Sequence, residues 1–354
     1  MQGIVERHAN DTRIWVTNGN LDIHLAKLDE EVLQSFNYMS FFNDGNMVEQ
    51  ATVADETNTY RIDLMGATGV KGRKAGQVIE NQKIANDKKT ITVDTMEYNR
   101  ITMDWMDNWT SPNRIAHIGK EQGIAMAKAY DLNHLVTLIK GGEWKADAVL
   151  KASGAFHDGV SITIDNFSTY DKKVQAQAIQ EAHGYLVDTF IKRNVGKEQL
   201  VTLVSSDWYS ILADSLVLTD TAYQGNQNEN NRVHRRVMYI NGVKIIELPI
   251  FLNKERTDAP LGDDFNLDTA LSKANMIVFN PSTSLIRVDA KGLTTRHYDM
   301  EVDMVQYLDA YRMYTVALKR GDAVGVVHAD ALYVPDTATA WSFTPPTAGG
   351  GLGG

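Results

Sequence analysis

A long amphipathic pattern covers residues 113–140. Apolar side chains recur there at alternating steps of three and four residues, which is the spacing of one buried helix face. They are Ile115, Ile118, Ala125, Ala129, Leu132, Val136 and Ile139, with Gln122 as the one polar gap. Ser111-Pro112 before the pattern and Gly141-Gly142 after it are typical of a helix start and a helix end. At 1.5 Å per residue this helix would be roughly 40 Å long, which a compact domain seldom needs.

Before this helix, three short segments alternate as strands do, namely Tyr60–Leu64, Thr90–Asp94 and Arg100–Trp105. Gly66, Gly69, Gly72 and Gly76 interrupt the chain after the first of them. Between residues 70 and 90, six cations (Lys71, Arg73, Lys74, Lys83, Lys88 and Lys89) stand against two anions (Glu80 and Asp87). The pattern predicts an extended two-stranded loop with a glycine-rich, basic tip. It is either a solvated flexible loop or a loop that lies on an acidic neighbouring subunit.

Leucine and valine spacing predicts an N-terminal helix after Asn18-Gly19, and an aromatic cluster follows it. This helix either packs on the main body or forms an arm that reaches a neighbour. Beyond residue 140 the patterns predict a strand at 160–164, a helix at 171–193, a strand at 200–204, a helix around Trp208, and short strands at 276–279 and 285–288. Asn241-Gly242 between two alternating segments predicts a β-hairpin.

Thr294–Leu318 contains few residues that would break a strand. If it were extended throughout, it would be a strand roughly 60–80 Å long at ~3.3 Å per residue. Gly321, Gly325 and the prolines after them predict a C-terminal tail with little core.

Composition narrows the class of protein. The 354 residues are 43% hydrophobic and 23% charged, which is ordinary for a globular protein. The absence of cysteine removes disulfides and thiolate chemistry. No apolar run approaches the ~18 residues of a membrane-spanning helix, and the N-terminus does not resemble a secretory signal. The formal net charge of −10 argues against tight phosphate binding, although not against loose enclosure of nucleic acid.

No motif predicts a catalytic, cofactor-binding or metal site. The nine histidines lack the HxxxH and HExxH spacings of zinc sites. The basic loop lacks the GxxxxGKS/T spacing of a phosphate cradle, and no GxSxG nucleophile motif is present. Asp299, Glu301 and Asp303 alternate with apolar residues, as on a half-exposed strand. Asp263-Asp264 offers oxygen ligands to a hard cation but lacks the calcium-loop spacing.

The order and lengths of four segments carry a resemblance to a known family. They are GKEQGIAMAKAYDLNHLVTLIKGG (119–142), VTLVSSDWYSILADS (201–215), RRVMYINGVKIIELPIF (235–251) and RHYDMEVDMVQYLDAYRMYTVALKRGDAVGVV (296–327). Together with the loop before them, they resemble the major capsid proteins of tailed bacteriophages of the Hong Kong 97 type, and among these the coat proteins of short-tailed (podovirus) phages.

The resemblance implies an α+β, Hong Kong 97-like fold. Its parts would be an N-terminal arm (1–57), an extended β-hairpin loop (58–105), a peripheral domain with the long spine helix (106–199), an axial domain (200–293), a return strand of the peripheral domain (294–335) and a C-terminal tail (336–354). It implies a structural subunit, not an enzyme, that self-assembles as pentamers and hexamers into an icosahedral shell. This virion capsid would be assembled in the host cytoplasm and would enclose phage double-stranded DNA without sequence-specific binding.

The family also implies partners. Scaffolding and portal proteins are implied, a decoration protein is a further partner that the family allows, and neither a cofactor nor a membrane is implied. Because no long coiled-coil-like N-terminal segment precedes the loop, the scaffolding protein is expected to be a separate chain. The alternatives are an encapsulin-like compartment shell that holds cargo enzymes, a metal-dependent hydrolase, and a tail-tube or decoration protein.

Charge suggests how copies would meet. The basic loop is unusual in an acidic chain, so we expect it to lie across an acidic surface of the next subunit. The expected contact residues are Lys71, Arg73, Lys74, Lys83, Lys88 and Lys89 on the loop, with Asp263 and Asp264 as the candidate acceptors.

Overall fold

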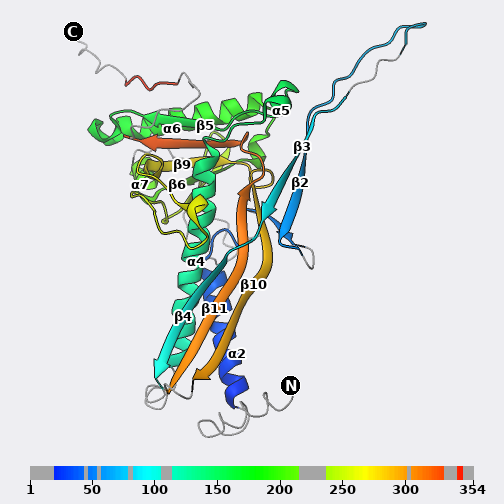
Figure 1. Ribbon diagram of the computed structural model, residues 1–354. Coiled ribbons are helices and arrows are strands. Elements are labelled where there is room, and N and C mark those ends of the chain that lie inside the picture. Colours follow the sequence, from blue (N-terminus) through cyan, green and yellow to red (C-terminus); the bar gives the residue numbers. More distant parts are fainter. Residues whose placement is uncertain are drawn as a thin grey trace, which may run out of the picture.

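The computed structural model describes residues 20–43, 47–53, 57–78, 83–104, 114–214, 237–300, 304–330 and 341–345. The molecule is elongated and has three parts: a six-stranded sheet at one end, a long stem of two helices and a four-stranded sheet, and a projecting hairpin (Figure 1). Among those residues, no helix combines the length and the apolar content that crossing a membrane requires.

The stem contains both of the helices predicted for the first 140 residues. The long helix is confirmed as α4 (Arg114–Gly141) and the N-terminal helix as α2 (Asn20–Met39). Ser111-Pro112, expected to start α4, lies outside the described residues. Leu28 and Val32 of α2 belong to one buried cluster with Ile115 of α4, so this part of α2 packs on the body of its own subunit.

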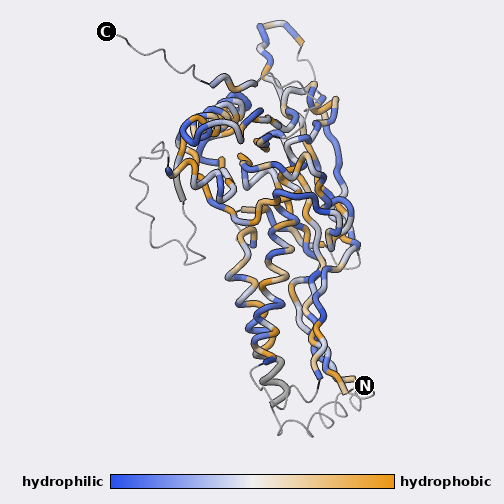
Figure 2. Tube along the Cα trace, turned by 90° about the vertical axis from the view of Figure 1, so that its left-hand side faces the viewer, coloured by the Kyte–Doolittle hydropathy of each residue, from blue (hydrophilic) through white to orange (hydrophobic). Residues whose placement is uncertain are grey.

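A four-stranded sheet forms the other layer of the stem, with the helices on one side of it (Figure 2). Its order is β1 (Glu49–Thr52), β10 (Leu285–Met300), β11 (Val305–Leu318) and β4 (Met96–Asp104). β1 runs parallel to β10, and the other neighbours are antiparallel. The third alternating segment of the sequence therefore lies in the stem, as β4, instead of in the loop.

The buried face of α4 differs from the predicted stripe in its middle. Ile115, Val136 and Ile139 are buried as predicted, but Ala125 is exposed and Gln122 is fully buried. Gln122 donates from Nε2 to the carbonyl oxygen of Leu308 at 2.8 Å, which satisfies its amide nitrogen inside the stem. The predicted stripe is wrong there because apolar periodicity does not count glycine, and Gly119 and Gly123 are buried against α2, with no room for a Cβ at Gly123.

The six-stranded sheet has the order β5 (Val160–Ile164), β12 (Val324–Ala329), β9 (Ala274–Phe279), β6 (Val201–Val204), β8 (Val243–Glu247) and β7 (Val237–Ile240). α6 (Lys172–Lys192) and α7 (Ser206–Asp214) pack on this sheet and form a hydrophobic core with it. Asn241 and Gly242 take φ angles of 53° and 80°, as the predicted two-residue turn requires. The expected axial domain began at residue 200, but β5, which precedes that residue, belongs to the same sheet.

The described residues also contain five short helices. They are α5 (Ala148–Ala152) and the 3₁₀ helices η2 (Phe167–Thr169), η3 (Lys197–Gln199), η5 (Asp263–Phe265) and η6 (Leu271–Lys273).

The single long strand predicted over 294–318 is wrong. β10 and β11 are two antiparallel strands, and Met300 pairs with Val305 across the reversal. Both strands present the same kind of alternation, so the pattern cannot show where one ends. Met304 adopts a left-handed conformation with φ 51°, a role in which glycine or asparagine would have been the usual sequence signal.

The predicted tail with little core is also wrong for residues 321–329. β12 lies inside the six-stranded sheet between β5 and β9, and Val324, Val326 and Val327 are fully buried. A Cβ at Gly325 would lie 2.8 Å from Leu186 Cδ2, so this glycine allows α6 to pack against the strand. In the sequence alone, this glycine resembles a chain breaker.

Candidate assembly interface

The projecting hairpin consists of β2 (Thr59–Met65) and β3 (Asn86–Thr92), paired antiparallel on both sides of the basic tip. Its root packs on the body through Ile62, Leu64, Ile91 and Val93, which share a buried cluster with Phe156 and with Ile286 and Val288 of β10. Gly66 N donates to Ala85 O at 2.7 Å and continues the ladder one step further. The hairpin is therefore rooted firmly and points away from the stem (Figure 1).

Lys89 belongs to the root and not to the tip. Its Nζ donates to the carbonyl oxygen of Leu318 at 2.7 Å, and burial lowers the pKa of its ammonium group. This cation is thus used inside its own subunit.

The tip beyond Gly66 is exposed to solvent. Lys71, Arg73, Lys74 and Lys83 are all exposed there, and Lys88, which lies on β3 opposite Asp63 and not on the tip, is exposed as well. Two valines of the tip are also exposed: Val70 is 103% exposed and Val78 is 89% exposed. Since apolar side chains gain free energy when they leave water, a tip that presents both cations and valines is suited to contact another surface.

The acidic candidates lie elsewhere on the subunit. Asp263 and Asp264 are exposed on η5, which packs beside α4. The carboxylate of Asp263 accepts from Asn266 Nδ2 at 3.0 Å, and the carbonyl oxygen of Asp264 accepts from Lys140 Nζ at 2.8 Å. The hairpin tip extends away from α4 (Figure 1), so the fold does not bring the two sets of residues together within one chain.

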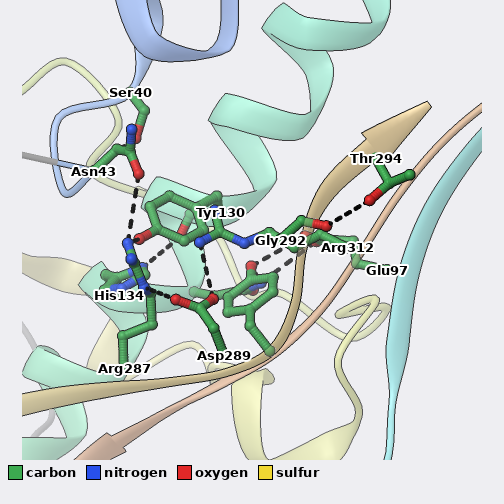
Figure 3. A network of polar contacts seen from close by, with 12 residues as sticks. Ser40, Asn43, Glu97, Tyr130, His134, Arg287, Asp289, Gly292, Thr294 and Arg312 are labelled. Carbon is green, nitrogen blue, oxygen red and sulfur yellow. Dashed lines mark hydrogen bonds and ion pairs between the residues drawn. The ribbon is translucent and has the colours of Figure 1, made fainter. Parts of the chain in front are cut away.

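A buried polar network, which the sequence did not predict, supports the stem between α4 and the sheet (Figure 3). Asp289 of β10 accepts from two arginines: Arg287 Nε at 2.6 Å and Arg312 Nη2 at 2.9 Å. The Arg312 guanidinium carbon lies 4.6 Å from the ring centre of Tyr130 and 5.0 Å from that of Tyr314. Arg287 Nη1 also donates to the Tyr130 hydroxyl. Two buried cations thus share one carboxylate and the faces of aromatic rings.

Two further carboxylates tie other elements to this network. Glu97 of β4 is 3% exposed and accepts from the Tyr314 hydroxyl at 3.0 Å, and burial raises its pKa. Asp131 of α4 accepts from Ser40 Oγ at 2.8 Å and from the backbone N of Phe41 at 2.7 Å. Asp131 therefore fixes the turn after α2 to the spine helix, and Glu97 fixes the edge strand β4.

Three buried histidines predict an acid-sensitive fold. Burial lowers the pKa of His134 to about 3, and those of His183 and His328 to about 4. In the unfolded chain these histidines bind a proton near pH 6.5, whereas in the folded chain they stay neutral at that pH. The free energy of unfolding is therefore fully retained above about pH 6.5. It decreases as the pH falls toward the folded values, by up to ~1.4 kcal/mol per pH unit for each histidine.

The test is denaturant unfolding of the subunit between pH 7.5 and 5. Glu97, whose pKa is raised, opposes the trend in part. We expect His183→Gln, which can keep the hydrogen bond to Thr202 Oγ1, to reduce the slope, whereas exposed His117→Gln leaves it unchanged. Equal slopes in all three proteins would contradict the assignment.

Within the described ranges, no group of three or more histidine, aspartate or glutamate side chains is arranged to hold a metal ion. The polar groups brought together in the stem are engaged with one another, as the network above shows. Among the described parts of the chain, the projecting hairpin is the candidate functional surface.

Solved structures with similar folds include two phage capsids and a virus-like particle. A chain of the mature capsid of bacteriophage PhiM1 superposes with a TM-score of 0.70 and 36% sequence identity, covering 83% of this chain and 88% of that one. A capsid chain of cyanophage P-SCSP1u has a TM-score of 0.64 and 13% sequence identity, and the match covers 82% of this chain and 88% of that one. A chain of a virus-like particle from Pyrococcus furiosus has a TM-score of 0.51 and 10% sequence identity, and the match covers 86% of this chain and 99% of that one. No protein-family model and no curated protein matches the chain.

The PhiM1 likeness shows the family, because it combines 36% identity with coverage of most of both chains. The other two likenesses are under 25% identical and show the fold alone. They confirm the expected α+β, Hong Kong 97-like fold. The chain belongs to the major capsid proteins of tailed bacteriophages and is a shell-forming structural subunit of the virion capsid.

Proposed function

We propose that this subunit assembles as pentamers and hexamers into an icosahedral shell that encloses phage double-stranded DNA, without enzymatic activity of its own. A net charge of −10 supports loose enclosure of DNA over tight binding. A separate scaffolding protein and a portal protein would take part in assembly. Nuclease-protected DNA in purified virions would support this function, whereas cargo enzyme in place of DNA would support a compartment shell, the alternative that the phage relatives do not favour.

The hairpin is the proposed contact between copies. The single observation that carries this proposal is the exposed tip, which combines cations with Val70 and Val78 in an acidic protein. In a shell this tip would lie across an acidic surface of the adjoining subunit. The candidate surface is the loop that carries Asp258, Asp263, Asp264 and Asp268, whose side chains are all exposed.

Repetition would make a weak contact effective. A single exposed ion pair is worth only ~0–1 kcal/mol, but each copy in a shell would contribute the same set. Lys89 is left out of the proposed contact because its ammonium group is bonded to Leu318 O in its own chain. The cations that remain are Lys71, Arg73, Lys74, Lys83 and Lys88.

The two ends of the molecule suggest how it is divided in the shell. We assign the stem, with α4 as its spine, to the peripheral domain, and the six-stranded sheet to the axial domain that meets its copies around five- and six-fold axes. β5 and α6 precede residue 200 but pack with that sheet, so the proposed axial domain also includes them. β10 crosses residue 293 without interruption, so the stem sheet includes residues 285–293 as well.

Charge reversal of the tip tests the proposed contact. The variant Lys71→Glu, Arg73→Glu, Lys74→Glu is expected to reduce particle yield at least tenfold, because the tip would then repel an acidic surface. The matched control reverses three exposed lysines outside the tip and outside the acidic loop: Lys128→Glu, Lys173→Glu and Lys192→Glu. It changes the net charge equally, so its yield is expected to stay close to that of the unmodified protein.

Particles are counted by sedimentation, and circular dichroism checks that both variants fold. A yield from the tip variant equal to that of the control would reject the contact.

A further inference from the structure

A short C-terminal segment lies on the outside of α6. Residues 341–345 alternate, with Trp341 and Phe343 half-buried and Ser342 and Thr344 exposed. The Trp341 ring centre is 6.3 Å from that of Tyr185, and the Phe343 ring centre is 5.7 Å from that of Tyr170. Figure 1 shows the segment, in red, beyond α6 at the end of the molecule. Two aromatic anchors thus hold the segment, one against Tyr185 of α6 and one against Tyr170 just before the helix.

The surface that receives these anchors is built independently of them. The opposite face of α6 is buried in the core of the six-stranded sheet through Ile179, Leu186 and Phe190, all at 0% exposure. Tyr185 lies on α6 and Tyr170 lies just before it, so the core holds the helix that carries Tyr185 in place without the tail. The same segment from another subunit would meet the same two rings.

The hold on the segment is weak and its tether is long. Within the described residues, ring packing holds 341–345, and no hydrogen bond or ion pair joins them to the body. An aromatic pair adds only ~0.5–1.5 kcal/mol beyond its area burial. Ten residues, 331–340, separate Asp330 from Trp341, and extended they reach roughly 35 Å. This exceeds the length of α6, which with 21 residues is about 30 Å.

We propose that in the shell this segment exchanges, so that Trp341 and Phe343 of one copy dock on the α6 surface of a second copy. Exchange keeps every contact of the segment and adds a link between subunits, which makes it a low-cost way to join identical chains. Neighbours held in a shell would present the surface at an effective concentration comparable to that of the chain's own copy. This inference rests on shell assembly, but not on the hairpin contact.

Cross-linking tests the exchange, because the chain has no cysteine of its own. The double variant Ser342→Cys, Asp188→Cys places thiols on the exposed side of the tail and one helical turn from Tyr185, and keeps all four rings. A short bismaleimide is added to free subunits and to purified shells. A control pair, Ser342→Cys, Lys128→Cys, places the second thiol on the exposed face of α4 and is expected to give little product.

The expected result is a change of product with assembly. Free subunits give an internally linked single chain on a denaturing gel, whereas shells give linked dimers and higher multimers. Shells made by mixing the two single variants, each as a minor fraction in unmodified protein, must then also give dimers.

Two results would overturn the proposal: single-chain product alone from shells, or no product in either state. Shell formation is scored separately by sedimentation of the unmodified protein, so failure of the exchange is distinguishable from failure to assemble.

Discussion

Replacing Asp289 with alanine is expected to lower the free energy of unfolding by about 3–5 kcal/mol, because it would leave two buried cations without their shared carboxylate. Arg287 and Arg312 are each 5% exposed and both bond to Asp289. Neither can lose its proton at neutral pH, so the cost cannot be avoided by neutralisation. The aromatic rings around Arg312 would compensate only in part.

The matched control is Asp214→Ala. Asp214 pairs with Lys172 at 3.4 Å, but their side chains are 64% and 75% exposed. Removing an exposed pair of this kind costs ~0–1 kcal/mol. Denaturant unfolding of dilute subunits measures both variants, and equal losses would show that the network does not stabilise the stem.

Gly123→Ala is expected to destabilise the subunit by about 1–3 kcal/mol. This is the opposite of the usual effect, because alanine in a helix interior is normally more stable than glycine by ~1 kcal/mol. A Cβ at this position would lie 1.9 Å from Ser35 Oγ and 2.5 Å from the carbonyl oxygen of Val32. Ser35 can rotate away, but the backbone of α2 cannot. The substitution therefore forces α2 away from α4.

A second helical glycine provides the control with the opposite sign. A Cβ at Gly184 of α6 would have Asn241 Nδ2 at 3.4 Å as its nearest neighbour, an ordinary contact. Gly184→Ala is expected to stabilise the subunit by up to ~1 kcal/mol through helix propensity alone. If thermal unfolding moved in the same direction for both variants, the close approach of α2 and α4 would not be the cause.

Elements with strong local signals were predictable from the sequence. α4 and α6 follow from apolar periodicity, and the turn at Asn241-Gly242 follows from two residues that tolerate positive φ. The reversal before β11 was not predictable, because Met304 carries no such signal. β12 was missed because Gly325, which serves close packing against Leu186, resembles a breaker in one dimension.

The candidate contact surface and the buried polar network differ in the same way. The basic tip is continuous in sequence, so its charge and glycine spacing are enough to identify it. The buried network is assembled from α4, β4, β10 and β11. Its one local signal was the polar group Asp131, Asn133 and His134 inside an apolar helix. Periodicity does not single out these residues, because it expects polar side chains to face water.

Lysine reactivity in free subunits and in shells tests most directly whether the hairpin tip is covered by a neighbouring subunit. An amine-reactive label is applied to both states, and mass spectrometry measures modification at Lys71 and Lys74 of the tip against Lys173 of α6, all exposed in the single subunit. Labelling of Lys71 and Lys74 is expected to fall severalfold on assembly, while that of Lys173 changes little. Unchanged labelling of the tip in closed shells would contradict it.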